Sequence, residues 1–290
     1  MEIRNYLSLI KFSHTIFAVP FAIIGFLLAA TLNNSSFDLP LFLKVLLCMV
    51  FARSAAMAFN RYIDKNIDSL NPRTKNREIP AGIIKASSAL LFVILNCLLF
   101  ITTTWFINEI CFYLSPIALF LVLGYSFTKR FTSLCHIILG AGLSLAPIGS
   151  YLAVTGKFDI LPVLFSLSVL FWVSGFDIIY ALQDEEFDKT NNLKSIPVLI
   201  GKKKALLLSS IFHIITVAFI IGAGYTGKFE LWYWIGSGLF SGLLIYQHSL
   251  VGPDNLSKVN IAFFTTNGIA GVLFAVFVFL ELYFQIRLPF

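Results

Sequence analysis

Long apolar stretches, separated by short polar breaks, run through the whole sequence. A helix needs about 20 residues to cross a bilayer core about 30 Å thick, and each stretch has a length close to this. Only 12% of the residues are charged, against roughly 25% in soluble domains. Helices are expected because lipid-facing backbone must satisfy its polar groups internally. The stretches are 12–32, 40–62, 86–106, 109–128, 133–154, 159–182, 204–223, 229–250 and 260–286. We predict an all-α, multi-pass membrane helical bundle with about nine transmembrane helices around a central cavity, in one domain of residues 1–290.

Basic residues are distributed unequally between the two ends of the predicted helices. With the N-terminus inside, sixteen of the 21 basic residues fall on one side and Arg53 lies within a helix. The four on the other side are Lys44, Lys157, Lys228 and Arg287. Basic loops face the cytoplasm, so we predict a protein of the cell inner membrane with cytoplasmic charged loops. The net charge of +6 follows from this topology, and no nucleic-acid partner is expected.

The first apolar run does not indicate a signal peptide, and the cysteines and histidines do not indicate a metal or redox site. The first run is about twenty residues long without a convincing cleavage site, so we expect a retained span and not a signal peptide. The cysteines and histidines show no spacing typical of a metal or redox site, and we expect them to pack in the bundle. They are Cys48, Cys97, Cys111, Cys135, His14, His136, His213 and His248.

A polar segment, "NRYIDKNIDSLNPRTKNREIP", begins inside the second stretch and concentrates charge in an otherwise apolar chain. Its residues Asn60, Asp64 and Asp68 are four apart, which places them on one helical face over two turns. We call these three residues the first acidic motif. The segment then continues with basic residues and an Ile-Pro pair.

A second segment, "DIIYALQDEEFDKTNNLKSIP", repeats this arrangement after the sixth stretch. Tyr180, Asp184 and Asp188 have the same spacing and form what we call the second acidic motif. Basic residues and another Ile-Pro pair follow. The likeness covers about twenty residues and suggests two facing halves, as in membrane bundles built from repeats.

The two motifs together predict a metal and phosphate site. Four carboxylates that face one another near a membrane require a cation, and oxygen ligands alone favour Mg²⁺, which completes its shell with water and substrate phosphates. Arg73, Lys129 and Lys194 are placed to bind phosphate oxygens. These features indicate a diphosphate site at the membrane surface with an apolar chamber behind it for a lipid tail. The alternative is a pair of solvated loops with weak surface ion pairs.

Both segments resemble the aspartate-rich signatures of the UbiA superfamily of intramembrane prenyltransferases. "NPRT" and "DIIYALQD" are most similar to its 4-hydroxybenzoate polyprenyltransferase branch, which includes relatives proposed to act in menaquinone synthesis. "KFSHTIFAVPFA" and "GYSFTKR" extend the resemblance over most of the chain.

The resemblance implies roles for particular residues. It places Arg53 beside an acceptor pocket. The residues that would hold Mg²⁺ on a prenyl diphosphate are Asn60, Asp64, Asp68, Asp184 and Asp188. Those that would surround the diphosphate are Arg73, Tyr125, Lys129, Tyr180 and Lys194. One departure is Asn60-Arg61, where the usual first motif begins Asn-Asp.

The implied activity is Mg²⁺-dependent transfer of a polyprenyl group to an aromatic quinone precursor of ubiquinone or menaquinone biosynthesis. The metal and basic residues would stabilise the leaving diphosphate, and the ring would attack the resulting allylic cation. Two alternatives stay open: a non-aromatic or tetrapyrrole acceptor, and a transporter of an anionic substrate. The acids lie at helix ends and not at the membrane midplane, which favours the prenyltransferase.

Overall fold

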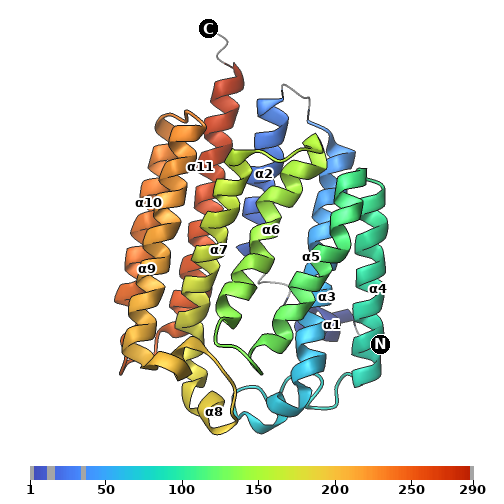
Figure 1. Ribbon diagram of the computed structural model, residues 1–290, viewed down its shortest axis with the longest axis vertical. Helices are drawn as coiled ribbons and strands as arrows, with labels where there is room; N and C mark the ends of the chain where they lie inside the picture. Colours follow the sequence, from blue (N-terminus) through green and yellow to red (C-terminus); the bar gives the residue numbers. More distant parts are fainter. Residues whose placement is uncertain (1–2, 12–16, 34–36, 288–290) are drawn as a thin grey trace.

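The computed structural model describes residues 3–11, 17–33 and 37–287, and shows a bundle of upright helices (Figure 1). The described residues contain no β-strand, only an isolated bridge between Gly252 and Asn255. The helices are α1 (Ile3–Leu9), α2 (Val19–Leu32), α3 (Leu39–Leu70), α4 (Ala86–Trp105), α5 (Glu109–Thr128), α6 (Cys135–Thr155), α7 (Ile160–Ala181), α8 (Glu185–Thr190), α9 (Ile196–Thr226), α10 (Leu231–Ser249) and α11 (Asn267–Arg287). A 3₁₀ turn, η2 (Leu182–Asp184), precedes α8, and a π-helical turn, η3 (Ile261–Thr266), leads into α11.

The predicted apolar stretches correspond to long helices. In the described part of the chain, seven helices are long and apolar enough to cross a membrane, and α2 is a shorter apolar helix. The multi-pass membrane bundle is therefore confirmed, whereas nine membrane crossings stay a prediction. The first predicted stretch begins at residues 12–16, which lie outside the described residues together with His14.

Helix α3 continues eight residues beyond the predicted stretch and carries the whole first acidic motif. Its first turn is capped by Asp38, whose carboxylate accepts a hydrogen bond from the Leu41 amide at 2.9 Å. It ends at Leu70 because Asn71 precedes Pro72, and the residue before a proline is driven out of the helical region.

The second acidic motif is not carried by one continuous α-helix, as its regular spacing suggested. Helix α7 ends at Ala181, and the chain makes a 3₁₀ turn through Asp184 before the short α8 begins. Tyr180 thus belongs to α7, Asp184 to the turn and Asp188 to α8. The spacing predicts a helical face, but it does not show that the α-helical hydrogen bonding is interrupted.

The aromatic core is formed by side chains of α7 together with those of α2, α10 and α11. Trp172 is fully buried there, and its indole N–H donates to Asn267 Oδ1 at 2.9 Å. The Asn267 amide in turn donates to the carbonyls of Ala262 and Phe263 at 3.0 and 2.9 Å. Asn267 therefore stabilises the junction between η3 and α11 and ties it to α7.

Candidate functional site

The aspartates of the two motifs lie at one end of the bundle, where α8 and the connection after α3 are found (Figure 1). Each is paired with a basic side chain, and three of the four pairs link segments that are far apart in the sequence. The pairs are Asp64 with Arg130 at 2.8 Å, Asp68 with Arg77 at 2.7 Å, Asp188 with Lys129 at 3.0 Å, and Asp184 with Arg73. Four acids and four bases thus meet at this end of the bundle.

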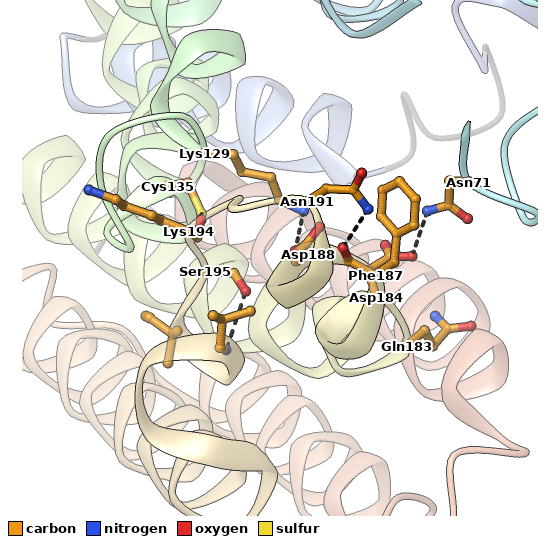
Figure 2. A network of polar contacts seen from close by, with 12 residues as sticks. Asn71, Lys129, Cys135, Gln183, Asp184, Phe187, Asp188, Asn191, Lys194 and Ser195 are labelled. Atoms are coloured by element: carbon orange, nitrogen blue, oxygen red, sulfur yellow. Dashed lines mark hydrogen bonds and ion pairs between the residues drawn. The ribbon is translucent and has the colours of Figure 1, made fainter. Parts of the chain in front are cut away.

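The "NPRT" segment joins the two motifs. The Arg73 guanidinium bonds both carboxylate oxygens of Asp184, with Nε 3.0 Å from Oδ1, and donates to the Tyr180 hydroxyl at 2.7 Å. Burial alone would lower the pKa of Arg73, but the hydrogen bond and charge of Asp184 together with Tyr180 raise it. The Asn71 amide also approaches Asp184, at 3.4 Å, as Figure 2 shows. Arg73 is therefore positively charged beside the second motif.

The first motif has a carboxylate oxygen that is not engaged. Asp68 Oδ1 accepts from Arg77, whereas Asp68 Oδ2 is buried and has no hydrogen-bond partner. Asn60 donates to Asp64 Oδ2 at 2.9 Å, and Thr74 donates to the Asp68 carbonyl at 3.1 Å. A buried acceptor without a donor is unfavourable unless another group binds it. This oxygen can therefore accept a ligand.

Lys129 and Lys194 have different surroundings. Burial alone would lower the pKa of Lys129, but the charge and hydrogen bond of Asp188 raise it above its ordinary value. The Lys194 side chain instead donates to the Phe131 carbonyl at 3.1 Å and is directed away from Asp184 and Asp188 (Figure 2). The structure thus places Lys129 among the acids and does not bring Lys194 to them.

An apolar cavity of about 420 Å³ lies between α3, α5 and α6, and Arg53 and Tyr125 are among the residues that line it. Arg53 is eleven residues before Asp64, which is about 16 Å along a helix. Other lining residues lie near the opposite helix ends, such as Val45 and Cys111. The cavity therefore runs from the inner side of the acidic end toward the opposite face of the bundle.

Arg61, the residue that departs from the usual first motif, lies inside the site. Its side chain is buried, and its Nε has no hydrogen-bond partner, as is also true of Arg53 Nε. On α3 it lies between Arg53, which lines the cavity, and Asp64 and Asp68. The departure therefore adds a buried positive charge between the acids and the cavity.

Sequence reasoning missed several residues that the structure brings to this end. Asn71, Arg77 and Arg130 contact the aspartates but were not singled out, although "NPRT" and "GYSFTKR" contain two of them. His136, which was expected only to pack, bonds Asp177 at 2.6 Å. Asp177 lies seven residues before Asp184, and this helical spacing was the available signal.

The side chains at this end of the bundle offer the oxygen ligands that Mg²⁺ prefers. Within the described ranges, no three His, Cys, Asp or Glu side chains lie together as a group that could hold a metal. Mg²⁺, however, is bound by one or two carboxylates together with waters and phosphate oxygens. Asp68 Oδ2 and the carboxylate oxygens that are now paired with basic residues can serve as these ligands. Binding would require basic side chains to exchange a carboxylate for a phosphate.

Comparison with known proteins identifies the family. The sequence profile of the UbiA prenyltransferase family matches residues 18–279. The chain belongs to this family. Among its relatives, the 4-hydroxybenzoate octaprenyltransferase of Tolumonas auensis is 32% identical over 223 residues, covering 77% of this chain and 78% of the relative. The enzyme of the same name from Nitrosomonas europaea is 32% identical over 228 residues, covering 78% of this chain and 77% of its own.

Solved structures of UbiA homologues have the same fold. The apo structure of a homologue from Aeropyrum pernix K1 has a TM-score of 0.80 and 27% identity, covering 94% of this chain and 98% of its own. A homologue from Archaeoglobus fulgidus bound to GPP and Mg²⁺ has a TM-score of 0.75 and 24% identity, covering 96% of this chain and 99% of its own. The UbiA fold therefore extends over nearly the whole chain.

Proposed function

We propose that this UbiA family member is a Mg²⁺-dependent aromatic polyprenyltransferase formed by a single domain of residues 1–290. The observation that carries the proposal is the arrangement of acids and bases from both halves of the bundle beside an apolar cavity. Charged residues bind a diphosphate and an apolar cavity holds a hydrocarbon tail. The names of the two bacterial relatives support transfer to an aromatic acid.

The acidic motifs would hold the metal. The proposed ligands are Asn60, Asp64, Asp68, Asp184 and Asp188. Their ligand atoms are oxygens, which suit Mg²⁺, and the unpartnered Asp68 Oδ2 is available to bind a cation. When bound, Mg²⁺ would supply positive charge that stabilises the leaving diphosphate. The homologue from A. fulgidus, which has the same fold, was solved with GPP and Mg²⁺.

The basic residues would bind the diphosphate oxygens. Arg73 and Lys129 now bond Asp184 and Asp188, and they would turn to the phosphate when the carboxylates bind the metal. Arg73 presents a planar fork that suits two phosphate oxygens at once. Tyr180 and Tyr125 would donate from their hydroxyls, and Lys194 would first have to release the Phe131 carbonyl.

The reaction then follows from charge and exclusion of water. Arg73 and Lys129 would stabilise the negative charge that develops on the diphosphate as the allylic carbon–oxygen bond breaks, so that its electron pair leaves with the diphosphate. The aromatic ring of the acceptor would attack the allylic carbon. The apolar cavity would hold the tail and keep water from the cation. Arg53 at the cavity would position the acceptor.

The acceptor class, pathway and membrane placement belong to the same proposal. We infer an aromatic quinone precursor of ubiquinone or menaquinone biosynthesis, and a bacterial inner membrane in which the acidic end faces the cytoplasm. The excess of basic residues in the loops at this end supports that orientation.

A direct test uses the purified protein in detergent with a polyprenyl diphosphate and a panel of hydroxybenzoate, naphthoate and futalosine-like acceptors. We expect a prenylated aromatic product by mass spectrometry and release of diphosphate, both only with Mg²⁺. Asp64→Asn and Asp184→Asn should abolish product, whereas Asp254→Asn, which alters an exposed acid in another loop, should not. Absence of product with every acceptor, together with anion flux in liposomes, would support the transporter instead.

A further inference from the structure

The second motif extends deeper into the bundle through Asp177. Asp177, Tyr180 and Asp184 are spaced by three and four residues, so they share one face of α7 and the turn that follows it. Asp177 lies about 10 Å further along the helix axis than Asp184. The side chain of Asp177 is 22% exposed. A carboxylate therefore lies between the acidic end of the bundle and the membrane interior.

Asp177 differs from the other acids of the site in its partner. The four motif aspartates each bond an arginine or lysine, whereas Asp177 bonds His136 Nδ1 at 2.6 Å and has no arginine or lysine partner in the described part of the chain. A carboxylate paired with a permanent cation is a poor proton acceptor, because the cation stabilises its charged form. Of these five acids, Asp177 is the one whose bonded partner is not an arginine or lysine.

His136 fixes the orientation of Asp177. Its Nε2 accepts a hydrogen bond from the Ile196 amide at 3.4 Å, so this nitrogen carries the lone pair and Nδ1 carries the proton that is donated to Asp177 Oδ2. The ring is almost fully buried, with 1% of the side chain exposed. One oxygen of Asp177 is thereby held by the His136 ring, and Oδ1 has no hydrogen-bond partner among the described residues.

Asp177 lies next to the inner end of the cavity. It bonds His136, which is three residues before Leu139 on α6, and Leu139 lines the cavity together with Tyr125. Tyr125 is four residues before Lys129, so α5 carries both a cavity residue and a base of the acidic end. Asp177 thus lies near the boundary between the diphosphate region and the cavity, where the allylic carbon and the acceptor ring would meet.

We propose that Asp177 is the general base that removes the ring proton of the acceptor, and that His136 is its positioning residue. The inference rests on the proposed prenyl transfer. After the allylic carbon has bonded to the ring carbon, that ring carbon loses its hydrogen as a proton to Asp177 Oδ1. The electron pair of the broken carbon–hydrogen bond restores the aromatic ring. General-base catalysis of this kind contributes about 10²–10⁴-fold.

The test compares Asp177→Asn with Asp159→Asn, which replaces the acid that caps the other end of α7. Asp159 accepts from the Leu161 amide at 3.0 Å, and asparagine serves equally well as a cap. Each protein is given unlabelled and ring-deuterated acceptor, and prenylated product, diphosphate and prenyl alcohol are measured. In Asp177→Asn we expect about 10²-fold less product, continued diphosphate release with more prenyl alcohol, and slower turnover with the deuterated ring.

The wild type and Asp159→Asn should show no slowing with the deuterated ring. His136→Leu should show the isotope effect, and His136→Gln, whose amide can still donate to Asp177, should reduce it. Wild-type rates and no isotope effect in Asp177→Asn would overturn the proposal. If Asp177→Asn does not fold, the isotope effect in His136→Leu decides. Absence of prenylated product in the wild type would instead refute the proposed function.

Discussion

Close packing of α6 on α7 at Gly140 allows a quantitative prediction. A Cβ added at Gly140 would lie 2.3 Å from the Leu170 carbonyl oxygen and 2.4 Å from Ser174 Oγ, whereas real Cβ contacts essentially never fall below 3.0 Å. In Gly140→Ala the two helices must therefore separate by at least about 0.7 Å. Such overpacking costs about 1–3 kcal/mol, and alanine returns up to about 1 kcal/mol through its higher helix propensity.

Gly149→Ala is the matched control. It lies in the same helix, and apart from the neighbouring backbone of that helix no atom lies within 4 Å of its added Cβ, so it has the propensity gain without the clash. The difference between the variants isolates the overpacking, about 1–3 kcal/mol. At roughly 2–4 °C per kcal/mol, Gly140→Ala should unfold about 2–12 °C below Gly149→Ala in detergent. Equal unfolding temperatures would refute the packing of α6 against α7.

The same variant has an expected effect on activity. Gly140 lies one helical turn from His136, so separation of α6 from α7 also lengthens the contact between His136 and Asp177. Gly140→Ala should therefore form less prenylated product than the wild type at a temperature where both are folded. Equal product formation would show that the contact between α6 and α7 does not control the site.

Three further outcomes are expected. Arg73→Lys loses the planar fork that bonds both oxygens of Asp184 here and would bond two phosphate oxygens in the reaction. It should lower kcat/KM about 10- to 100-fold, since hydrogen bonds to charged groups contribute about 1.5–3 kcal/mol, and unchanged kinetics would contradict its role. Trp172→Phe leaves Asn267 Oδ1 without its donor and should lower the free energy of unfolding by about 1–3 kcal/mol, measured by denaturant titration. Because the pKa of Lys129 is raised in the folded protein, its contribution to stability is present below the ordinary lysine pKa of 10.5 and is lost as pH rises through the raised value. Wild-type unfolding temperature should fall above about pH 10.5 more steeply than in Lys129→Met, and parallel profiles would contradict the pairing.

The helical bundle was predictable because membrane helices are specified by length and hydrophobicity alone. Boundaries were less predictable where polar residues continue a helix, as in α3 to Leu70, or where an apolar stretch ends in a 3₁₀ turn, as after Ala181. No periodicity distinguishes an α-helix from such a turn over three residues. The acidic spacing was visible in the sequence, but the interruption of hydrogen bonding after α7 was not.

The candidate site was predictable in its acids and less so in its partners. Asp64 and Asp184 follow from spacing on a helix, which is local information. Their partners Arg130 and Arg73 come from other segments, and pairing over such separations depends on the packing of the bundle. Conversely, Lys194 is close to the second motif in sequence, but its side chain bonds the Phe131 carbonyl and not the acids.

In the proposed enzyme, acids from both halves of the bundle hold one prenyl diphosphate through a divalent cation. The most direct measurement is a crystal structure with a prenyl thiodiphosphate and Mn²⁺ in place of Mg²⁺, in which anomalous scattering locates the metal. We predict a peak bound by Asp64 or Asp68 on one side and by Asp184 or Asp188 on the other, with Arg73 turned from Asp184 to the diphosphate. A metal bound elsewhere, or a diphosphate bound while the contact between Arg73 and Asp184 stays intact, would refute this site.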